Sequence, residues 1–508
     1  MYRILTASKD TYITNKIINN SFRATDANLG SAGTLDLFKL YDENTIGSET
    51  KPIELSRLLI KFPISEIAKM DTDGVLDITD SSFKCTVKLH DVYGGQTTPS
   101  NFKAILFPLA IDFDEGPGMD VVNYSDVSSS NFITASITNG SAVKWSKPGA
   151  MSSGSLGASN IDVYTSGSLS LTTGPTNVSL SPVQTFETGR EDLIIDVTRI
   201  VSGTVSGQIP DKGFLIALSG SYEKNEFSYF VKRFASRDVQ VAALRPKLTI
   251  SFDDSMTDRH SDFIFNVSSS LYLRNFQYGT LANIVSNTAG ATLSGKDCMV
   301  VKLESGSFKE TYKVSQVLNG RHRQTGVYSA SFAVSSFDSI LSEQANLTGS
   351  ITFNEVWTNT AETITFLSSS LTIKRANRSI TNTQNQNNLL VTVLNVNDEY
   401  RAGEIVNVRV FAEDRDRPVS FVRTPYEKKS QIFAEMYYRV RDVVDGKIII
   451  AFDKSNNSTK LSTDSDGMFF DFYTDSLPRG RMYAFDFLIR RNGKDTVIKD
   501  AASNFKVI

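Results

Sequence analysis

The chain has 508 residues, 40% of them hydrophobic and 21% charged, a globular composition with material for about three domains. Its net charge of −3 argues against a general nucleic-acid-binding protein, which would carry a basic excess. The longest apolar runs fall far short of the roughly 20 residues that a membrane helix needs. The N-terminus lacks the apolar segment of a signal peptide. We therefore expect no membrane insertion and no secretory route.

Strands dominate the pattern along the chain. Short runs of β-branched and aromatic residues alternate with turns rich in Gly, Ser, Asn and Thr. Many runs place apolar residues at every second position, which predicts strands with one buried face. We expect helical turns only after Pro63, over 64–68, and at Asp196 or Thr198, with either residue as N-cap. The clearest predicted strands, in chain order, are 57–62, 84–89, 214–218, 247–252 and 406–411.

This pattern predicts an all-β protein: an N-terminal jelly-roll or β-sandwich followed by two smaller immunoglobulin-like β-sandwich domains. We place the domains at 1–252, 263–375 and 389–508, with polar linkers at 253–262 and 378–388. A segment rich in Ser, Thr, Gly and Asn, around 123–185, interrupts the first domain. It is either a long surface insertion or a set of small twisted strands. Because it is poor in large apolar residues, we expect it to order on assembly.

A series of short motifs runs in order through the first domain. In three-letter code they are Ala-Ser-Lys-Asp-Thr-Tyr-Ile (7–13), Asn-Leu-Gly (28–30), Ser-Arg-Leu-Leu-Ile-Lys-Phe-Pro (56–63), Phe-Asp-Glu-Gly (113–116), Trp-Ser-Lys-Pro-Gly (145–149), Asp-Val-Thr (196–198), Gly-Phe-Leu-Ile (213–216), Phe-Ala-Ser-Arg (234–237) and Arg-Pro-Lys-Leu-Thr-Ile (245–250). The set resembles the DNRLRE-type jelly-roll modules, relatives of carbohydrate-binding modules on bacterial surface and secreted proteins. The resemblance implies a jelly-roll fold for the first half.

The sequence departs from that pattern at three places. Pro63 stands where the pattern usually has Asp, Ala150 where it often has a second Gly, and Arg237 where an acidic residue is usual. The resemblance therefore implies the fold more strongly than any ligand site. Read physically, the Asn-Leu-Gly motif is a turn in which Gly30 can take a positive φ. The run at 57–62 suits the middle of a sandwich.

Trp145 is the principal candidate binding residue of the first domain. With the Pro-Gly pair that follows, it places an aromatic ring on a tight turn. It could stack on a sugar ring, but a lid over the core is the favoured interpretation. Tyr93 and Tyr124 are the other aromatics that could contact a glycan.

Acidic and thiol groups give no firm metal or catalytic site. Asp112, Asp114 and Glu115 could bind Ca²⁺, yet they lack the ligand spacing of a calcium loop, and a solvated acidic loop is favoured. The two cysteines, Cys85 and Cys298, exclude a disulfide framework, and two reduced thiols are favoured over one bridge.

The three histidines (His90, His260 and His322) fall in different regions, so unrelated packing roles are favoured over a zinc site. The chain has no Gly-x-Ser-x-Gly elbow with a partner histidine, no Walker loop and no His-Glu-x-x-His motif. We therefore expect no catalytic residues, no cofactor and no metal.

The second half resembles no enzyme family. Two sandwiches rich in Ser, Asn and Thr, a near absence of Cys, and a DNRLRE-like module that starts without a signal are similar to virion proteins of tailed phages with contractile tails. We expect a non-enzymatic structural protein of a tailed-bacteriophage virion: a tail, baseplate, neck or fibre-attachment component, made in the host cytoplasm. Its partners would be other virion proteins and copies of itself. The alternative is a carbohydrate-binding adhesion protein that recognises host surface polysaccharide. An enzyme, such as a lyase or hydrolase subunit, is the third class.

Overall fold

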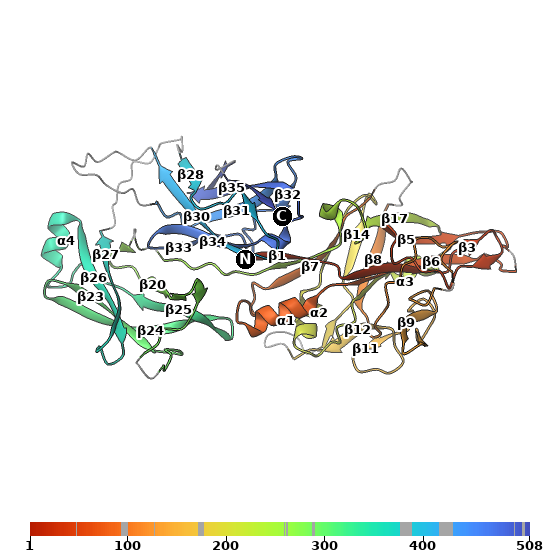
Figure 1. Cartoon of the computed structure of the whole chain (residues 1–508), viewed down its shortest axis with the longest axis horizontal. Helices are drawn as coiled ribbons and strands as arrows, with labels where there is room; N and C mark the ends of the chain where they lie inside the picture. Colours follow the sequence, from red (N-terminus) through yellow and green to blue (C-terminus); the bar gives the residue numbers. More distant parts are fainter. Residues whose placement is uncertain are drawn as a thin grey trace. The chain divides into compact units, whose positions relative to one another are not determined.

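The computed structural model describes residues 1–46, 48–92, 100–125, 127–170, 177–258, 260, 263–286, 290–375, 389–415, 430–491, 493–499 and 503–508. They divide into two compact units. The first unit contains residues 3–72 and 83–251, and the second contains 1–2, 73–82 and 252–508. β-Strands are the main regular secondary structure of both units (Figure 1), which confirms the predicted all-β fold.

Two sheets form the first unit. One has the strand order β1-β18-β7-β15, and the other has the order β14-β8-β16-β6-β5-β17, with β2 also paired to β6. Smaller sheets are β3-β4, β10-β9 and β11-β12-β13. The strands are β1 (Tyr2–Thr6), β2 (Lys9–Thr14), β3 (Ile17–Ile18), β4 (Phe22–Arg23), β5 (Thr34–Tyr41), β6 (Ile53–Lys61), β7 (Lys84–Leu89), β8 (Phe102–Pro108), β9 (Thr134–Thr138), β10 (Ser141–Lys144), β11 (Ser153–Ser155), β12 (Val163–Ser168), β13 (Asn177–Ser179), β14 (Val183–Phe186), β15 (Leu193–Asp196), β16 (Phe214–Leu218), β17 (Tyr229–Ala235) and β18 (Lys247–Ser251).

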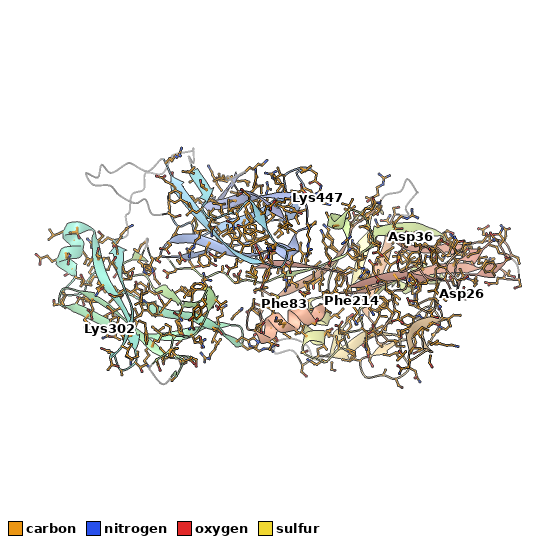
Figure 2. All side chains as sticks on the ribbon, viewed as in Figure 1. Asp26, Asp36, Phe83, Phe214, Lys302 and Lys447 are labelled. Carbon is orange, nitrogen blue, oxygen red and sulfur yellow. The ribbon has the colours of Figure 1, made fainter. Side chains whose placement is uncertain are left out.

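Strand β6 lies in the middle of the larger sheet, as its apolar sequence predicts. Leu58, Leu59 and Ile60 are fully buried, because both faces of a central sandwich strand are covered. Its neighbour β16 carries Phe214, labelled in Figure 2, whose ring packs near Phe62 with centroids 6.2 Å apart.

Both predicted helical turns are present. Helix α1 (Ile64–Thr72) begins directly after Pro63, which its fixed φ favours at a helix start. Helix α2 is Thr198–Val205, and its N-cap is Val197, which makes no side-chain cap hydrogen bond, so the predicted N-caps Asp196 and Thr198 are wrong. Asp196 Oδ1 accepts the N–H of Thr198 at 2.8 Å from outside the helix. The remaining helices of the first unit are the short α3 (Gly220–Lys224) and the 3-10 turn η1 (Ala242–Leu244).

The segment around 123–185 is the set of small strands that was one of its two predicted alternatives. Strands β9 to β14 form within the single chain. Its side chains Ala135, Trp145 and Val163 belong to a buried cluster with Leu215 of β16. These strands complete the core of their own unit, and the expectation that the segment orders on assembly stays a prediction.

The structure corrects the expectation for Gly30 and shows the conformation of Ala150, which stands where the resembled pattern often has Gly. Gly30 does not have a positive φ; its missing side chain leaves room for Glu115, whose carbonyl oxygen would lie 2.0 Å from an added Cβ. Ala150 instead takes the left-handed conformation, with φ of 54°. It does so where the resembled pattern often has Gly, and its carbonyl accepts the Arg57 guanidinium at 2.9 Å.

The second unit contains a seven-stranded sheet and a two-sheet sandwich. The strand orders are β19-β27-β26-β23-β24-β25-β20 for the first, and β28-β30-β34-β33 with β29-β37-β35-β31-β32 for the second, where β36 also pairs with β35. Short additions are the β21-β22 hairpin, helix α4 (Ser342–Thr348) and the turn η2 (Thr474–Ser476). The strands are β19 (Phe263–Ile264), β20 (Ser269–Arg274), β21 (Phe276–Gln277), β22 (Thr280–Leu281), β23 (Met299–Ser305), β24 (Phe308–Asn319), β25 (His322–Phe332), β26 (Ser350–Asn359), β27 (Thr365–Lys374), β28 (Leu389–Val393), β29 (Glu399–Tyr400), β30 (Ile405–Asp414), β31 (Met436–Asp442), β32 (Ile448–Ile450), β33 (Ser462–Asp464), β34 (Gly467–Tyr473), β35 (Met482–Arg491), β36 (Lys494–Ile498) and β37 (Asn504–Val507).

The sheets of the described residues keep to the three predicted ranges, but residues 253–258 of the first predicted linker are ordered. The Met1 amine donates to the Phe252 carbonyl at 2.5 Å and pairs with Asp254. Thr257 pairs in parallel with Thr463 beside β34. This segment is thus part of the packing of the second unit. The second predicted linker, 378–388, lies outside the described residues.

Candidate functional site

A cavity of about 300 Å³ in the second unit gathers the charged groups with the most convergent geometry. The extended segment before β19 contributes two of them, and β20, β26, β30, β33 and the turn after β33 contribute the others. We call it the His260 cavity. Its charged and aromatic lining comprises Asp258, His260, Tyr272, Arg274, Phe276, Glu355, Arg409, Asp464, Asp466 and Phe469.

His260 lies between two carboxylates. Its Nδ1 is 3.1 Å from Asp258 Oδ1, and its Nε2 is 2.8 Å from Glu355 Oε2. The outer oxygens are bonded as well: Asp258 Oδ2 accepts the N–H of Tyr272 at 3.0 Å, and Glu355 Oε1 accepts the indole N–H of Trp357 at 2.5 Å. Asp258 and Glu355 are each about 1% exposed, so the triad is a closed network of charge-assisted hydrogen bonds.

The electrostatics of this triad fix its protonation. Burial by itself lowers the pKa of His260, but the hydrogen bonds and charges of Asp258 and Glu355 outweigh it and raise this pKa to about 10. The imidazole is therefore protonated at neutral pH and donates from both nitrogens. Burial also raises the pKa of Asp258, against the opposing effect of His260.

Two arginines line the cavity beside one aromatic ring. The guanidinium carbons of Arg274 and Arg409 lie 4.6 and 4.9 Å from the centroid of Phe469. Arg409 pairs with Asp464 at 2.6 Å, whereas Arg274 reaches Asp471 only at 3.9 Å. The buried Arg274 Nε finds no hydrogen-bond partner in the described part of the chain.

The groups that line the His260 cavity can bind a polar ligand, but they are poorly suited to acid–base chemistry. A general base needs an unoccupied atom that can take a proton near neutral pH. Both ring nitrogens of His260 are occupied, and its pKa is far from neutral. The Arg274 edge remains available as a donor, and Asp466 offers an acceptor on the same lining.

The aromatics predicted to stack on a glycan are not brought together into such a surface. Trp145 is 4% exposed, and its Nε1 donates to the Asn131 carbonyl at 3.0 Å. The indole is thus a core side chain in this structure, with no face open to a sugar ring. Tyr124 is half-buried, and its carbonyl accepts the N–H of Asn28 at 3.1 Å. Tyr93 lies outside the described residues.

Several sequence motifs of the first unit do meet in space. The Asn28 side chain accepts from Gly118 N at 2.7 Å and Gly30 N at 3.3 Å, and donates to the carbonyls of Glu115 and Ser130 at 2.9 and 2.8 Å. It thereby joins the Asn-Leu-Gly motif to the Phe-Asp-Glu-Gly motif through Glu115, and to the neighbouring residues Gly118 and Ser130. The residue is fully buried, so this is a structural hub.

Asp10 lies beside that hub. Its N–H donates to Glu115 Oε1 at 2.9 Å, and its Oδ2 accepts the N–H of Arg237 at 2.6 Å. Arg237 also pairs with Glu115 Oε2 at 3.0 Å, so the basic residue that departs from the resembled pattern neutralises a buried acid here. Burial raises the pKa of Asp10 to about 7, against the Arg237 hydrogen bond. Its Oδ1 is buried and has no partner among the described residues.

The remaining acidic and basic candidates are engaged in ordinary contacts. Asp112 pairs with Lys61 at 3.2 Å, and Asp114 accepts the N–H of Ile137 at 2.7 Å. Among the residues that the structure describes, no three His, Cys, Asp or Glu side chains are placed to hold a metal ion. Cys85 and Cys298 are not disulfide-bonded. None of the described helices is long and apolar enough to cross a membrane.

Sequence reasoning missed the His260 triad, although one signal pointed to it. Strand β26 alternates buried and exposed residues, and Glu355 occupies the buried phase between Phe353 and Trp357. An acid in the core phase of a strand needs a cationic or donor partner. The identity of that partner, far away in the sequence, could not be read from the strand.

The sequence matches no protein family and no curated protein. Solved structures that match include a titin substructure, with 8% identity, a TM-score of 0.14 and coverage of 51% of this chain and 97% of that chain. A Corynebacterium diphtheriae protein described as membrane-anchored has 9% identity and a TM-score of 0.16, covering 100% of this chain and 96% of its own. Four immunoglobulin domains of Dscam1 have 11% identity and a TM-score of 0.12, with 58% of each chain covered. Such low scores carry no argument about function, and the chain's own strands establish it as an all-β protein of the β-sandwich type.

Proposed function

We propose that the chain is a non-enzymatic structural protein of a tailed-bacteriophage virion. It acts through assembly with other virion proteins and with copies of itself. The observation that carries the non-enzymatic part is the closed His260 triad, where each charged group is held by another group of the same chain. The ordered motifs of the first half and the virion-like composition of the second support the virion part.

The proposed mechanism is scaffolding by rigid sandwiches. Buried polar hubs such as Asn28 hold loops in fixed positions, so that these loops can present a constant surface to a neighbour. The second unit also exposes large apolar side chains: Phe276 (54%), Tyr278 (98%), Phe337 (81%) and Leu347 (79%). Exposed apolar side chains of this size are typical of contact surfaces when they are contiguous.

Two measurements test this proposal. Mass spectrometry of purified virions of the phage that encodes the chain should find it at a fixed ratio to the other structural proteins. Its absence from intact particles would refute the proposal. Light scattering behind size-exclusion chromatography of the full chain should show a defined oligomer, or a monomer that assembles when a virion partner is added.

Carbohydrate binding is the second candidate function, and the His260 cavity favours it. The cavity volume of about 300 Å³ lies at the lower end of ligand pockets. The unpartnered Arg274 edge donates and Asp466 accepts, which suits a polyhydroxylated ligand. A glycan array should then detect the wild-type chain and lose the signal with Arg274→Ala but not with Trp145→Phe. A blank array with the wild-type chain would remove this candidate.

A further inference from the structure

Lys232 of β17 is a fully buried lysine beside a carboxylate in the first unit. Its Nζ lies 2.5 Å from Asp91 Oδ1 and 3.0 Å from the carbonyl oxygen of Gly189. The side chains of Lys232 and Asp91 are only 1% and 12% exposed. Asp91 follows β7 and pairs with Phe234 of β17. Lys232 is therefore its diagonal neighbour across the strand pair, within reach of a long side chain.

Aromatic rings flank the lysine end of this pair, and the backbone fixes the aspartate end. The Nζ lies 5.3 Å from the ring centroid of Phe186 and 5.2 Å from that of Phe234. The backbone holds the pair in register, because the N–H of Val92 donates to the carbonyl of Arg233 at 2.9 Å, and the N–H of Asp91 donates to Asp192 Oδ1 at 2.9 Å. The two reacting groups are thus preorganised in a site from which bulk water is excluded.

Burial also favours transfer of a proton from Lys232 to Asp91. Burial lowers the pKa of Lys232, while the hydrogen bond and charge of Asp91, and the charges of Glu191 and Asp192, act against this. Moving the proton from the ammonium to the Asp91 carboxylate replaces two buried charges with a neutral amine and a neutral acid. That transfer is easiest where ions are poorly solvated.

We propose that Lys232 and Asp91 condense spontaneously to an intramolecular isopeptide bond. After the proton transfer, the Lys232 amine attacks Cγ of Asp91 and forms the C–N bond. The C–O bond then breaks, and the hydroxyl leaves as water with one of the two amine protons, while the other stays as the amide N–H. The ammonium and the carboxylate become one amide and one water molecule, and neither an oxidant nor a co-substrate is needed. The product ties β17 covalently to the end of β7.

The chain contains a matched internal control. Lys302 and Glu362 are also a close lysine–carboxylate pair, at 2.6 Å, with the lysine 10% exposed. Glu362, however, is 44% exposed, so water reaches this carboxylate and its ion pair stays solvated. We expect Lys302 to remain an ordinary lysine.

Intact-mass spectrometry of the reduced, full-length chain tests the proposal. After native purification, the wild-type mass should be lower by one water molecule than the mass calculated from the sequence. A tryptic digest should contain one branched peptide that joins the segments of Asp91 and Lys232, and cleavage after Lys302 should proceed normally. A full wild-type mass together with normal cleavage after Lys232 would overturn the proposal.

Three variants test whether the Lys232 amine and the Asp91 carboxylate are the groups that react. Lys232→Arg keeps the buried charge but cannot form the amide, so it should keep its full calculated mass while retaining native tryptophan fluorescence. Asp91→Ala should also keep its full mass. Asp91→Asn should lose ammonia instead of water and so end at the same final mass as the wild type. Wild-type chain kept in denaturant should hold its full mass until it is refolded; a mass loss without folding would contradict the role of the buried site.

Discussion

Two buried polar clusters, one in each unit, pair their buried polar groups in different ways. In the first unit, Asn28 makes four neutral hydrogen bonds, three of them to distant segments, and the neighbouring Asp10 is buried with one oxygen that has no partner among the described residues. In the second unit, His260 joins two segments through a fully paired ionic triad. The neutral hub positions backbone without any cost of burying charge, whereas the triad depends on all three of its charges.

The two units should also differ in how their stability depends on pH. The folded-state pKa of Asp10 is raised, to about 7, and that of His260 is raised, to about 10. In both cases the folded state holds a proton that the unfolded chain has already released. The first unit should therefore lose stability as pH rises from about 4 to 7, and the second from about 6.5 to 10.

Tryptophan fluorescence can follow the two units separately. The chain has two tryptophans, Trp145 in the first unit and Trp357 in the second. A Trp357→Phe background leaves the first unit as the reporter, and a Trp145→Phe background leaves the second.

The largest effect is expected for Asn28→Ala. It strands two N–H groups and two carbonyls that are buried, at about 1–3 kcal/mol for each unsatisfied group. We expect the free energy of unfolding of the first unit to fall by about 4 kcal/mol or more. Urea unfolding followed through Trp145 measures it. Because Asn28→Asp keeps only the accepting half of the hub, it should fall between the wild type and Asn28→Ala. An unchanged midpoint for Asn28→Ala would show that the hub is dispensable.

His260→Ala should destabilise the second unit by about 3 kcal/mol at neutral pH, because it leaves two buried carboxylates without their cation. The transition reported by Trp357 should shift, and that reported by Trp145 should stay. The partly exposed His322→Ala serves as the control. If both histidine variants shifted the Trp357 transition equally, the triad would have no special role.

Asp10→Asn should flatten the pH dependence of the first unit. The wild type should lose stability between pH 4 and pH 8, because the pKa of Asp10 is raised from 3.8 in the unfolded chain to about 7 in the folded state. The variant cannot ionise at this position and should lose much less. Unfolding midpoints of the wild type and of the variant, compared at each pH across this range, check it. A wild-type profile that rises through this window would contradict the raised pKa.

The smallest effect is expected at the surface. Lys454 pairs with Asp495 at 2.7 Å, with both side chains more than one-third exposed. Lys454→Ala should leave both transitions unchanged, because an exposed ion pair gains little over solvated charges. A clear shift in either transition would mean that this pair is coupled to the buried network.

The candidate site shows where sequence reasoning stops. The alternation in β26 identifies Glu355 as a buried acid, yet its partner His260 is on a segment that the polar composition suggested was a linker. The pairing of Lys232 with Asp91 could not be read from the sequence either. The two residues meet because β17 runs beside the end of β7. Such pairs depend on which strands become neighbours, and strand periodicity does not carry that information.

The sequence by itself determined the all-β class and the helices that start after Pro63 and at Thr198. These features follow from local periodicity and the fixed φ of proline, both of which act within a few residues. Only the tertiary structure decided that Trp145 is a core side chain, that Gly30 is required by close approach, and that His260 stays charged. Each depends on burial and on groups brought from distant segments, because desolvation and pairing arise only once the sheets have packed.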